Sequence, residues 1–295
     1  MFDHRPIYGH IRFSFYGMTD TRLRPDADGT ALARLYGETR MARRFFLFEA
    51  LTLPSLLAQT DRNFKTILMS SDVMPDVYKD RLTSLAARLP GAEVIFSDNR
   101  RGDRAFRRTM LDSLGPASTG TAVHFRLDDD DALAATYIAR LRQLSQTVPA
   151  STHITFPTGM SLFPKDGNTP EGVSMVHSHF LPSPGLATVN GPSFNKNPFQ
   201  MMHGNVWTRW PLLSDPTFPA FIRAHHFEND TVSRQDKVLL ALRRARLGRR
   251  RAAQHAESVT QALAAHFPFI DQTGLDALIA RSAAIAGMAD LPALG

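Results

Sequence analysis

The sequence of 295 residues contains no cysteine. Disulfide bonds and thiolate metal sites are therefore excluded, and a reducing cytosol is the expected compartment. No apolar run reaches the roughly 18 residues that a membrane-spanning helix needs. The first residues, MFDHRPIYGHIRFSF, include an early acid and no purely apolar block, so we expect no signal peptide. Together these absences predict a cytoplasmic protein.

The excess of positive charge is concentrated in one short cluster. The chain has a formal net charge of +6 and a pI of about 10.0, which would be compatible with nucleic-acid binding. However, residues 243–251 read RRARLGRRR, and without this arginine cluster the chain is close to neutral. We therefore expect no nucleic-acid partner. The cluster Arg243–Arg251 is either a solvated helix end or a peripheral contact with anionic lipid at the inner membrane face.

In the first 150 residues, the spacing of apolar side chains alternates between that of strands and that of helices. The predicted strands are residues 11–16, 64–71, 92–97 and 123–127. The predicted helices are residues 45–60 (with Pro54 as a kink), 75–89, 103–114 and 134–146. This order is typical of an α/β fold in which helices flank a mostly parallel sheet and ligands bind beyond the carboxyl ends of the strands.

Proline and glycine interrupt the second half of the chain often. Residues 153–157 and 175–181 are predicted strands that extend the sheet as antiparallel additions, and long loops surround them. Residues 232–246 and 252–291 are predicted to be helical. We assign residues 1–245 to one α/β domain and residues 246–295 to a basic, helical C-terminal extension that packs on the domain or trails it.

Four consecutive aspartates, Asp128–Asp131, follow directly on the apolar strand VHFRL. Adjacent carboxylates repel one another, so a positive group is expected beside them. In an extended chain Asp128 and Asp130 would share one face, where their oxygens could hold Mg²⁺ or Mn²⁺ together with a phosphate-bearing ligand. The alternative is capping of the helix predicted from residue 134, but capping requires only one or two acids.

The run LDDDD resembles the DxD motif of glycosyltransferases with the GT-A fold. More specifically, the chain is similar to a bacterial rhamnosyltransferase family over about residues 10–235. The segments that carry this resemblance are HIRFSFYG, RFFLFEALTLPSLLAQTDRNFKTILMSS, FRLDDDDAL and FIRAHHFENDTVSR. The resemblance implies a GT-A-like fold and metal-dependent transfer of a sugar, such as rhamnose, from a nucleotide-diphosphate donor to a glycan, a lipid-linked acceptor or another hydroxyl group.

The resemblance also implies roles for individual residues. The metal ligands would be Asp128, Asp130 and His226. The nucleotide-sugar donor would be bound by Asp72, Arg101, Arg107, Arg108, Asp128, Asp129 and Asp131. Asp72 could equally be the N-cap of the helix that follows. Glu228 or Asp230 would be the base that removes the proton of the acceptor, and the intervening Asn229 leaves the choice between them open.

His203 and Trp207 are candidates for an acceptor-side wall, because aromatic faces commonly stack on sugar rings. The alternative for the tryptophan is core packing. A nucleotidyltransferase would also use paired acids and a divalent ion, but the segment IRFSFYGMTD lacks the glycine-rich basic loop that we would expect after its first strand. A non-catalytic anion- or membrane-binding module acting through Arg243–Arg251 would bind its ligand independently of the aspartates.

Overall fold

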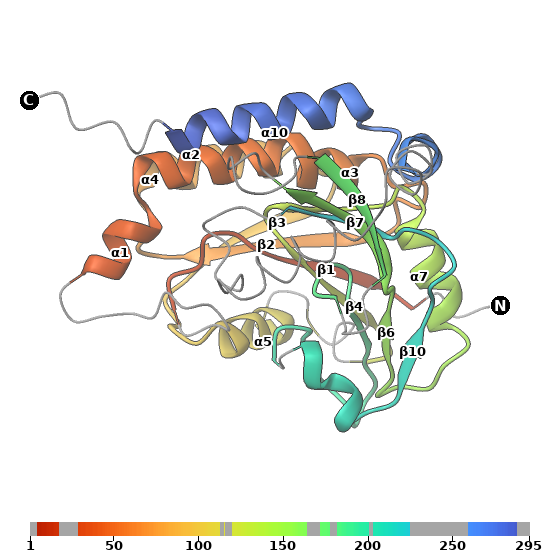
Figure 1. Cartoon of the computed structure of the whole chain (residues 1–295). Helices are drawn as coiled ribbons and strands as arrows, with labels where there is room; N and C mark the ends of the chain where they lie inside the picture. The colour runs from red at the N-terminus through yellow and green to blue at the C-terminus, as the bar shows by residue number, and fades with distance from the viewer. Residues whose placement is uncertain are drawn as a thin grey trace, which may run out of the picture.

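The computed structural model describes residues 5–17, 29–112, 115, 120–163, 172–177, 182–200, 203–224 and 259–287. A seven-stranded sheet lies at its centre, in the order β10-β6-β9-β4-β1-β2-β3 (Figure 1). β1 pairs in parallel with β2 and β4, and β2 pairs in parallel with β3, whereas β9 runs antiparallel to β4 and β6. This confirms the predicted α/β fold with a mostly parallel sheet and antiparallel additions. The strands are β1 (Ile7–Arg12), β2 (Lys65–Ser71), β3 (Ala92–Ser97), β4 (Val123–Asp128), β6 (His153–Thr155), β9 (Ala187–Val189) and β10 (Leu212–Ser214).

A second sheet has four strands in the order β5-β11-β7-β8. Its first strand begins at Asp131, only three positions after β4 ends at Asp128, so the aspartate run links the two sheets. The strands of this sheet are β5 (Asp131–Leu133), β7 (Thr158–Phe163), β8 (Gly172–His177) and β11 (Phe221–Ala224).

Helices cover both faces of the large sheet (Figure 1). One face carries α2 (Glu38–Leu47), which continues through the π-helical turn η1 (Phe48–Thr52) into α3 (Leu53–Leu57), together with α4 (Asp76–Ala86) and α7 (Tyr137–Ser145). The opposite face carries α5 (Gly102–Asp112). A further helix, α10 (Gln272–Gly287), lies on α2, and its leucines join the apolar cluster that contains Leu47 and Leu51.

The boundaries differ from the predicted ones where long-range pairing outweighs the local pattern. β1 covers residues 7–12 rather than 11–16, because its pairing with β4 runs from Ile7 to Arg12. The helix predicted at residues 45–60 already begins at Glu38. The π-helical turn comes just before Pro54, which has no N–H for an intrahelical hydrogen bond. The helix predicted from residue 134 begins at Tyr137 instead.

The helical prediction for residues 252–291 holds in two pieces, residues 259–266 and α10, with a break between them. The helix predicted at residues 232–246 and the cluster Arg243–Arg251 lie outside the described residues. In the part of the chain that is described, no helix is both long and apolar enough to cross a membrane.

Candidate active site

The carboxyl ends of β1 and β4 lie side by side, with Arg12 directly opposite Asp128 in the register of the two strands. The chain turns sharply after each of these ends. Ser14 has a φ of 40°, which is uncommon for a residue other than glycine, and Asp129 and Asp130 form a turn. Polar groups from both segments therefore meet at the edge of the sheet where α/β proteins bind their ligands.

Asp128 is held between two arginines. Nη2 of Arg12 lies 3.0 Å from its Oδ1, and Nη2 of Arg126 lies 3.7 Å from its Oδ2. The hydroxyl of Ser183 also donates a hydrogen bond to Oδ2, at 3.3 Å. The Asp128 side chain is 21% exposed, whereas those of Asp129 and Asp130 are 4% and 7% exposed. Of these three acids, Asp128 is therefore the one that solvent and ligands can most readily reach.

Asp129 and Asp130 share the guanidinium group of Arg44. Nη1 of Arg44 lies 2.7 Å from Oδ1 of Asp129 and 2.8 Å from Oδ2 of Asp130. The backbone N–H of Ser14 donates a second hydrogen bond to Asp129, at 3.2 Å, and Arg40 in turn donates to the Ser14 hydroxyl. The turn at these residues means that the extended-chain geometry assumed for Asp128 and Asp130 does not apply. The repulsion among the carboxylates of Asp128–Asp130 is offset by guanidinium groups within the fold.

Burial changes the proton affinity of the inner acids. It raises the pKa of Asp129 to about 6, an effect that Arg44 opposes and that the neighbouring Asp130 reinforces. Burial, followed by the charge of Asp130, raises the pKa of Asp131 well above its ordinary value. Oδ1 of Asp131 accepts a hydrogen bond from the backbone N–H of Ala224 at 3.2 Å, so this acid ties β5 to the end of β11. The site therefore disfavours additional uncompensated negative charge in its interior.

The sheet face below the site is polar, which is unusual for a buried face. His10 of β1 and His124 of β4 lie in its centre, and their rings are joined by a hydrogen bond of 2.9 Å between Nε2 of His10 and Nδ1 of His124. Burial, and then the neighbouring His124, lower the pKa of His10 well below its usual value. Phe106 of α5 covers the pair, with its ring centroid 5.7 Å from that of His10. A buried, hydrogen-bonded histidine pair thus lies beneath the site.

Phe199 packs against both arginines that hold Asp128. The guanidinium carbon of Arg126 lies 4.3 Å from the centre of its ring, and that of Arg12 lies 5.3 Å away. Phe199 also stacks on Phe106 of α5, with ring centroids 4.4 Å apart. Planar guanidinium groups are stabilised over aromatic faces, so this packing fixes where the two positive charges lie.

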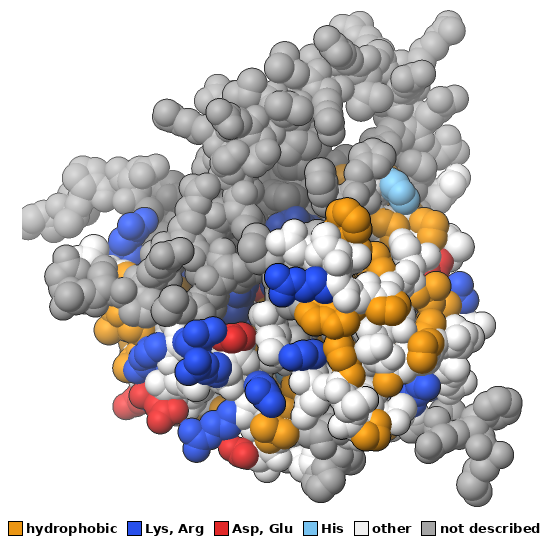
Figure 2. Space-filling view, turned by 90° about the horizontal axis from the view of Figure 1, so that it is seen from below, with side chains coloured by type: hydrophobic (Ala, Val, Ile, Leu, Met, Phe, Trp, Pro, Cys, Tyr) orange, Lys and Arg blue, Asp and Glu red, His pale blue; other side chains and the backbone are white. Residues whose placement is uncertain are grey.

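Of the predicted donor-binding arginines, Arg107 and Arg108 lie on the outer face of α5, and Arg101 comes just before its first residue. Arg101, Arg107 and Arg108 are exposed, because α5 turns Ala105, Phe106 and Met110 toward the sheet. Arg101 pairs with Asp103 at 3.2 Å, and Arg108 pairs with Asp112 at 3.1 Å. Figure 2 shows the side of the molecule on which α5 lies, with many Lys and Arg side chains and few acidic ones. Donor binding by these exposed arginines stays a prediction.

Asp72 lies just beyond the carboxyl end of β2 and pairs with Arg100 at 2.6 Å. Its alternative role as a helix cap is wrong, because the N-cap position of α4 is occupied by Pro75 and no side chain caps the helix. Arg100 also lies over the ring of Tyr16, at 5.6 Å from its centre. A Cβ at Gly17 would lie only 2.5 Å from the carbonyl oxygen of Arg100, so a side chain at this position would push the two segments apart.

Of the remaining predicted residues, Trp207 is described and the side chains of the others are not. Trp207 lies in the short helix η2 (His203–Thr208) and is 64% exposed, so it does not pack in the core. Trp210 does pack, against His153 and Phe194. The side chain of His203 and all of His226, Glu228 and Asp230 lie outside the described residues.

The described residues do not fit the predicted Mg²⁺ or Mn²⁺ site as they are arranged. Among them, no group of three or more His, Asp or Glu side chains could hold a metal ion. Of the predicted ligands, Asp130 already accepts the guanidinium group of Arg44 through Oδ2, at 2.8 Å. Asp128 already accepts those of Arg12 and Arg126. A metal site that includes His226 stays a prediction, and no step is assigned to a metal below.

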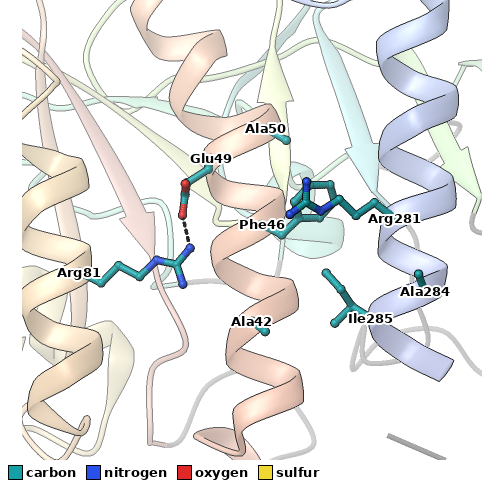
Figure 3. A pocket seen from close by; sticks show the side chains of 8 residues that line it. All are labelled: Ala42, Phe46, Glu49, Ala50, Arg81, Arg281, Ala284 and Ile285. Atoms are coloured by element: carbon teal, nitrogen blue, oxygen red, sulfur yellow. Dashed lines mark hydrogen bonds and ion pairs between the residues drawn. The ribbon is translucent and has the colours of Figure 1, made fainter. Parts of the chain in front are cut away.

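The groove shown in Figure 3 lies among α2, η1, α4 and α10, and not at the aspartate run. Its volume is about 670 Å³, and none of the four aspartates lines it. Arg81 pairs with Glu49 across one side, at 2.5 Å, and Arg281 of α10 lies over the ring of Phe46 (Figure 3). The groove is lined by Ala42, Phe46, Glu49, Ala50, Arg81, Arg281, Ala284 and Ile285.

Comparison with protein-family models decides the family. A model described as "Putative rhamnosyl transferase" matches residues 6–238. The chain belongs to this family. The match includes the aspartate run and both strands that border it, and it confirms the resemblance inferred from the sequence. No curated protein matches the chain.

Several solved structures are similar to this rhamnosyl transferase family member at low sequence identity. S. aureus TarS 1–349 matches with a TM-score of 0.43 and 8% identity, over 74% of this chain and 60% of that one. The same fragment in complex with UDP matches with a TM-score of 0.41 and 9% identity, over 79% of this chain and 68% of that one. A 4-diphosphocytidyl-2C-methyl-D-erythritol synthase from Anaerococcus prevotii matches with a TM-score of 0.39 and 9% identity, over 83% of this chain and 98% of that one. The chain thus spans about 60% of the TarS 1–349 fragment.

Three site residues of this family member were not predicted from the sequence: Arg12, Arg44 and Arg126. Arg126 carried a usable signal, since a charged residue inside an apolar strand is rarely buried without a partner. It is 1% exposed and faces Asp128. Arg44 offered no such signal, because its helix contains two other arginines, Arg40 and Arg43.

Proposed function

We propose that this rhamnosyl transferase family member moves a sugar from a nucleotide-diphosphate donor to a hydroxyl group of a glycan or a lipid-linked acceptor. The bond between the anomeric carbon and the diphosphate oxygen breaks, and a bond to the acceptor oxygen forms. The acceptor proton passes to a base, for which Glu228 and Asp230 are the proposed groups. The nucleoside diphosphate leaves with the electron pair of the broken bond.

The observation that carries the proposal is the position of Asp128 within the family match. It is a partly exposed acid at the carboxyl end of a central parallel strand, with guanidinium groups on two sides. An acid at this place can accept hydrogen bonds from the hydroxyls of a donor, and the surrounding arginines provide positive charge for its phosphates. Asp72, at the end of β2, is the proposed contact for the nucleobase.

The test is a transfer assay with purified protein and UDP-, GDP- and dTDP-linked sugars, with rhamnose first because the family name specifies it. Release of the nucleoside diphosphate is measured with and without Mn²⁺. One donor should support release and should also raise the melting temperature of the protein. Asp128→Asn should abolish release and leave the fold intact, while Asp112→Asn, an exposed control on α5, should behave as wild type.

Absence of release and of stabilisation with every donor, with and without Mn²⁺, would refute the proposal. Release that is unchanged in Asp128→Asn would move the site away from the aspartate run.

A further inference from the structure

The aspartate run is surrounded by arginine, and the carboxylate at its accessible end has two guanidinium partners. Two guanidinium groups, of Arg12 and Arg126, lie on the single carboxylate of Asp128. Deeper in, Arg44 lies between the carboxylates of Asp129 and Asp130. The inner acids are thus already partnered by arginine, and the outer acid has two guanidinium groups as partners.

We infer that the diphosphate of the donor binds directly to the guanidinium of Arg12, in place of a divalent cation held by the aspartates. This inference rests on the proposed function and assigns its diphosphate site. Arg12 is the last residue of β1, and its side chain is 14% exposed beside an acid that is 21% exposed. It therefore lies at the accessible edge of the pair, whereas the side chain of Arg126 is only 2% exposed and lies behind it.

The double pairing of Asp128 makes an exchange of partners feasible. When a phosphate oxygen takes one face of Arg12, Asp128 keeps Arg126 and the hydroxyl of Ser183 as partners. Opening an ion pair at a partly buried site is costly when it leaves a carboxylate unpaired. This exchange leaves none unpaired. The planar fork of a guanidinium can also bind two phosphate oxygens at once.

A cation on the inner acids would meet the opposite situation. On Asp130, the inner one of the predicted ligands, it would have to displace Arg44 from a short contact of 2.8 Å with Oδ2. The displaced guanidinium would then be left in a buried region, close to a doubly charged ion that repels it. Direct binding by arginine avoids both penalties and still places a positive charge against the leaving diphosphate.

Phe199 keeps Arg12 and Arg126 in place for this role. Its ring lies against both guanidinium carbons, at 5.3 and 4.3 Å, and is itself held by stacking on Phe106. An arginine fixed in this way loses little conformational freedom when it binds phosphate. The positive charge is therefore positioned before the donor arrives.

The experiment measures binding of UDP, GDP and dTDP, and of the matching nucleosides, by calorimetry in EDTA and in Mn²⁺. For the nucleotide that binds, we expect equal affinity in the two buffers. Arg12→Gln should weaken binding of that diphosphate tenfold or more and leave binding of the nucleoside unchanged. Arg140→Gln is the matched control, because it opens the ion pair with Asp215 without touching the site.

Binding that requires Mn²⁺ and is lost in EDTA would overturn the inference and leave the proposed transferase intact. Unchanged diphosphate affinity in Arg12→Gln would overturn it as well. If no nucleoside diphosphate binds in either buffer, both the inference and the proposed function fail. The chelation experiment needs no variant, so it decides the matter even if Arg12→Gln does not fold.

Discussion

Replacing Asp129 with asparagine should change how the stability of this protein depends on pH. Burial raises the pKa of the Asp129 carboxyl from 3.8 to about 6, even though Arg44 opposes the change. The folded protein therefore binds the proton more tightly than the unfolded chain does. The free energy of unfolding that this group contributes is highest at low pH and is lost as the pH rises toward and through the folded-state value. Asparagine removes this dependence.

The magnitude follows from the two pKa values. They differ by about two units, and each unit corresponds to about 1.4 kcal/mol, so wild type should lose about 3 kcal/mol relative to Asp129→Asn across the full titration. About 2 kcal/mol of this change falls between pH values of about 4.5 and about 7, where the measurement is practical.

The assay is urea denaturation of both proteins across this pH range, followed by circular dichroism. The difference in unfolding free energy, wild type minus variant, should fall as the pH rises. Asp215→Asn provides a control of opposite sign. Burial acts to raise the pKa of Asp215, but hydrogen bonds from Arg140 and Thr217 outweigh it and lower the pKa. The unfolding free energy that Asp215 contributes is therefore fully present above the ordinary pKa of an aspartate and is lost as the pH falls below it.

A difference between wild type and Asp129→Asn that is flat, or that rises with pH, would refute the reasoning. It would show that the guanidinium of Arg44 governs the proton affinity of Asp129 and that burial does not.

Three further changes test other parts of the structure. Arg44→Met should lower the unfolding free energy by about 3–5 kcal/mol, since it removes the guanidinium that contacts two buried carboxylates. Adding Asp129→Asn and Asp130→Asn should recover most of the loss in urea denaturation, and no recovery would contradict the electrostatic explanation. Gly9→Ala should cost about 1–3 kcal/mol, because the new methyl carbon would lie 2.4 Å from an aromatic carbon of β4; an unchanged melting curve would count against the packing described. Trp207→Ala should alter the unfolding free energy by less than about 0.5 kcal/mol, because the side chain is 64% exposed. A rise in KM for the acceptor alone would then support its acceptor-side role.

The sequence by itself determined the alternation of strands and helices and the position of the aspartates at a strand end. Both follow from local rules, since side chains repeat every two residues in a strand and every 3.6 in a helix. β2 and β3 were predicted to within one residue for this reason. The start of β1 was not, because it depends on the register with a strand more than a hundred residues later.

Only the tertiary structure decided which positive groups face the aspartates. From the sequence, the repulsion within Asp128–Asp131 called for a cation, and a metal ion was the simplest choice. In the fold, Arg12 reaches Asp128 across 116 positions, and Arg44 reaches Asp129 across 85. Local spacing carries no information about pairs so far apart, because the path of the whole chain brings them together. The sequence therefore predicted the need for positive charge, and the packing of β1, β4 and α2 determined that arginine supplies it.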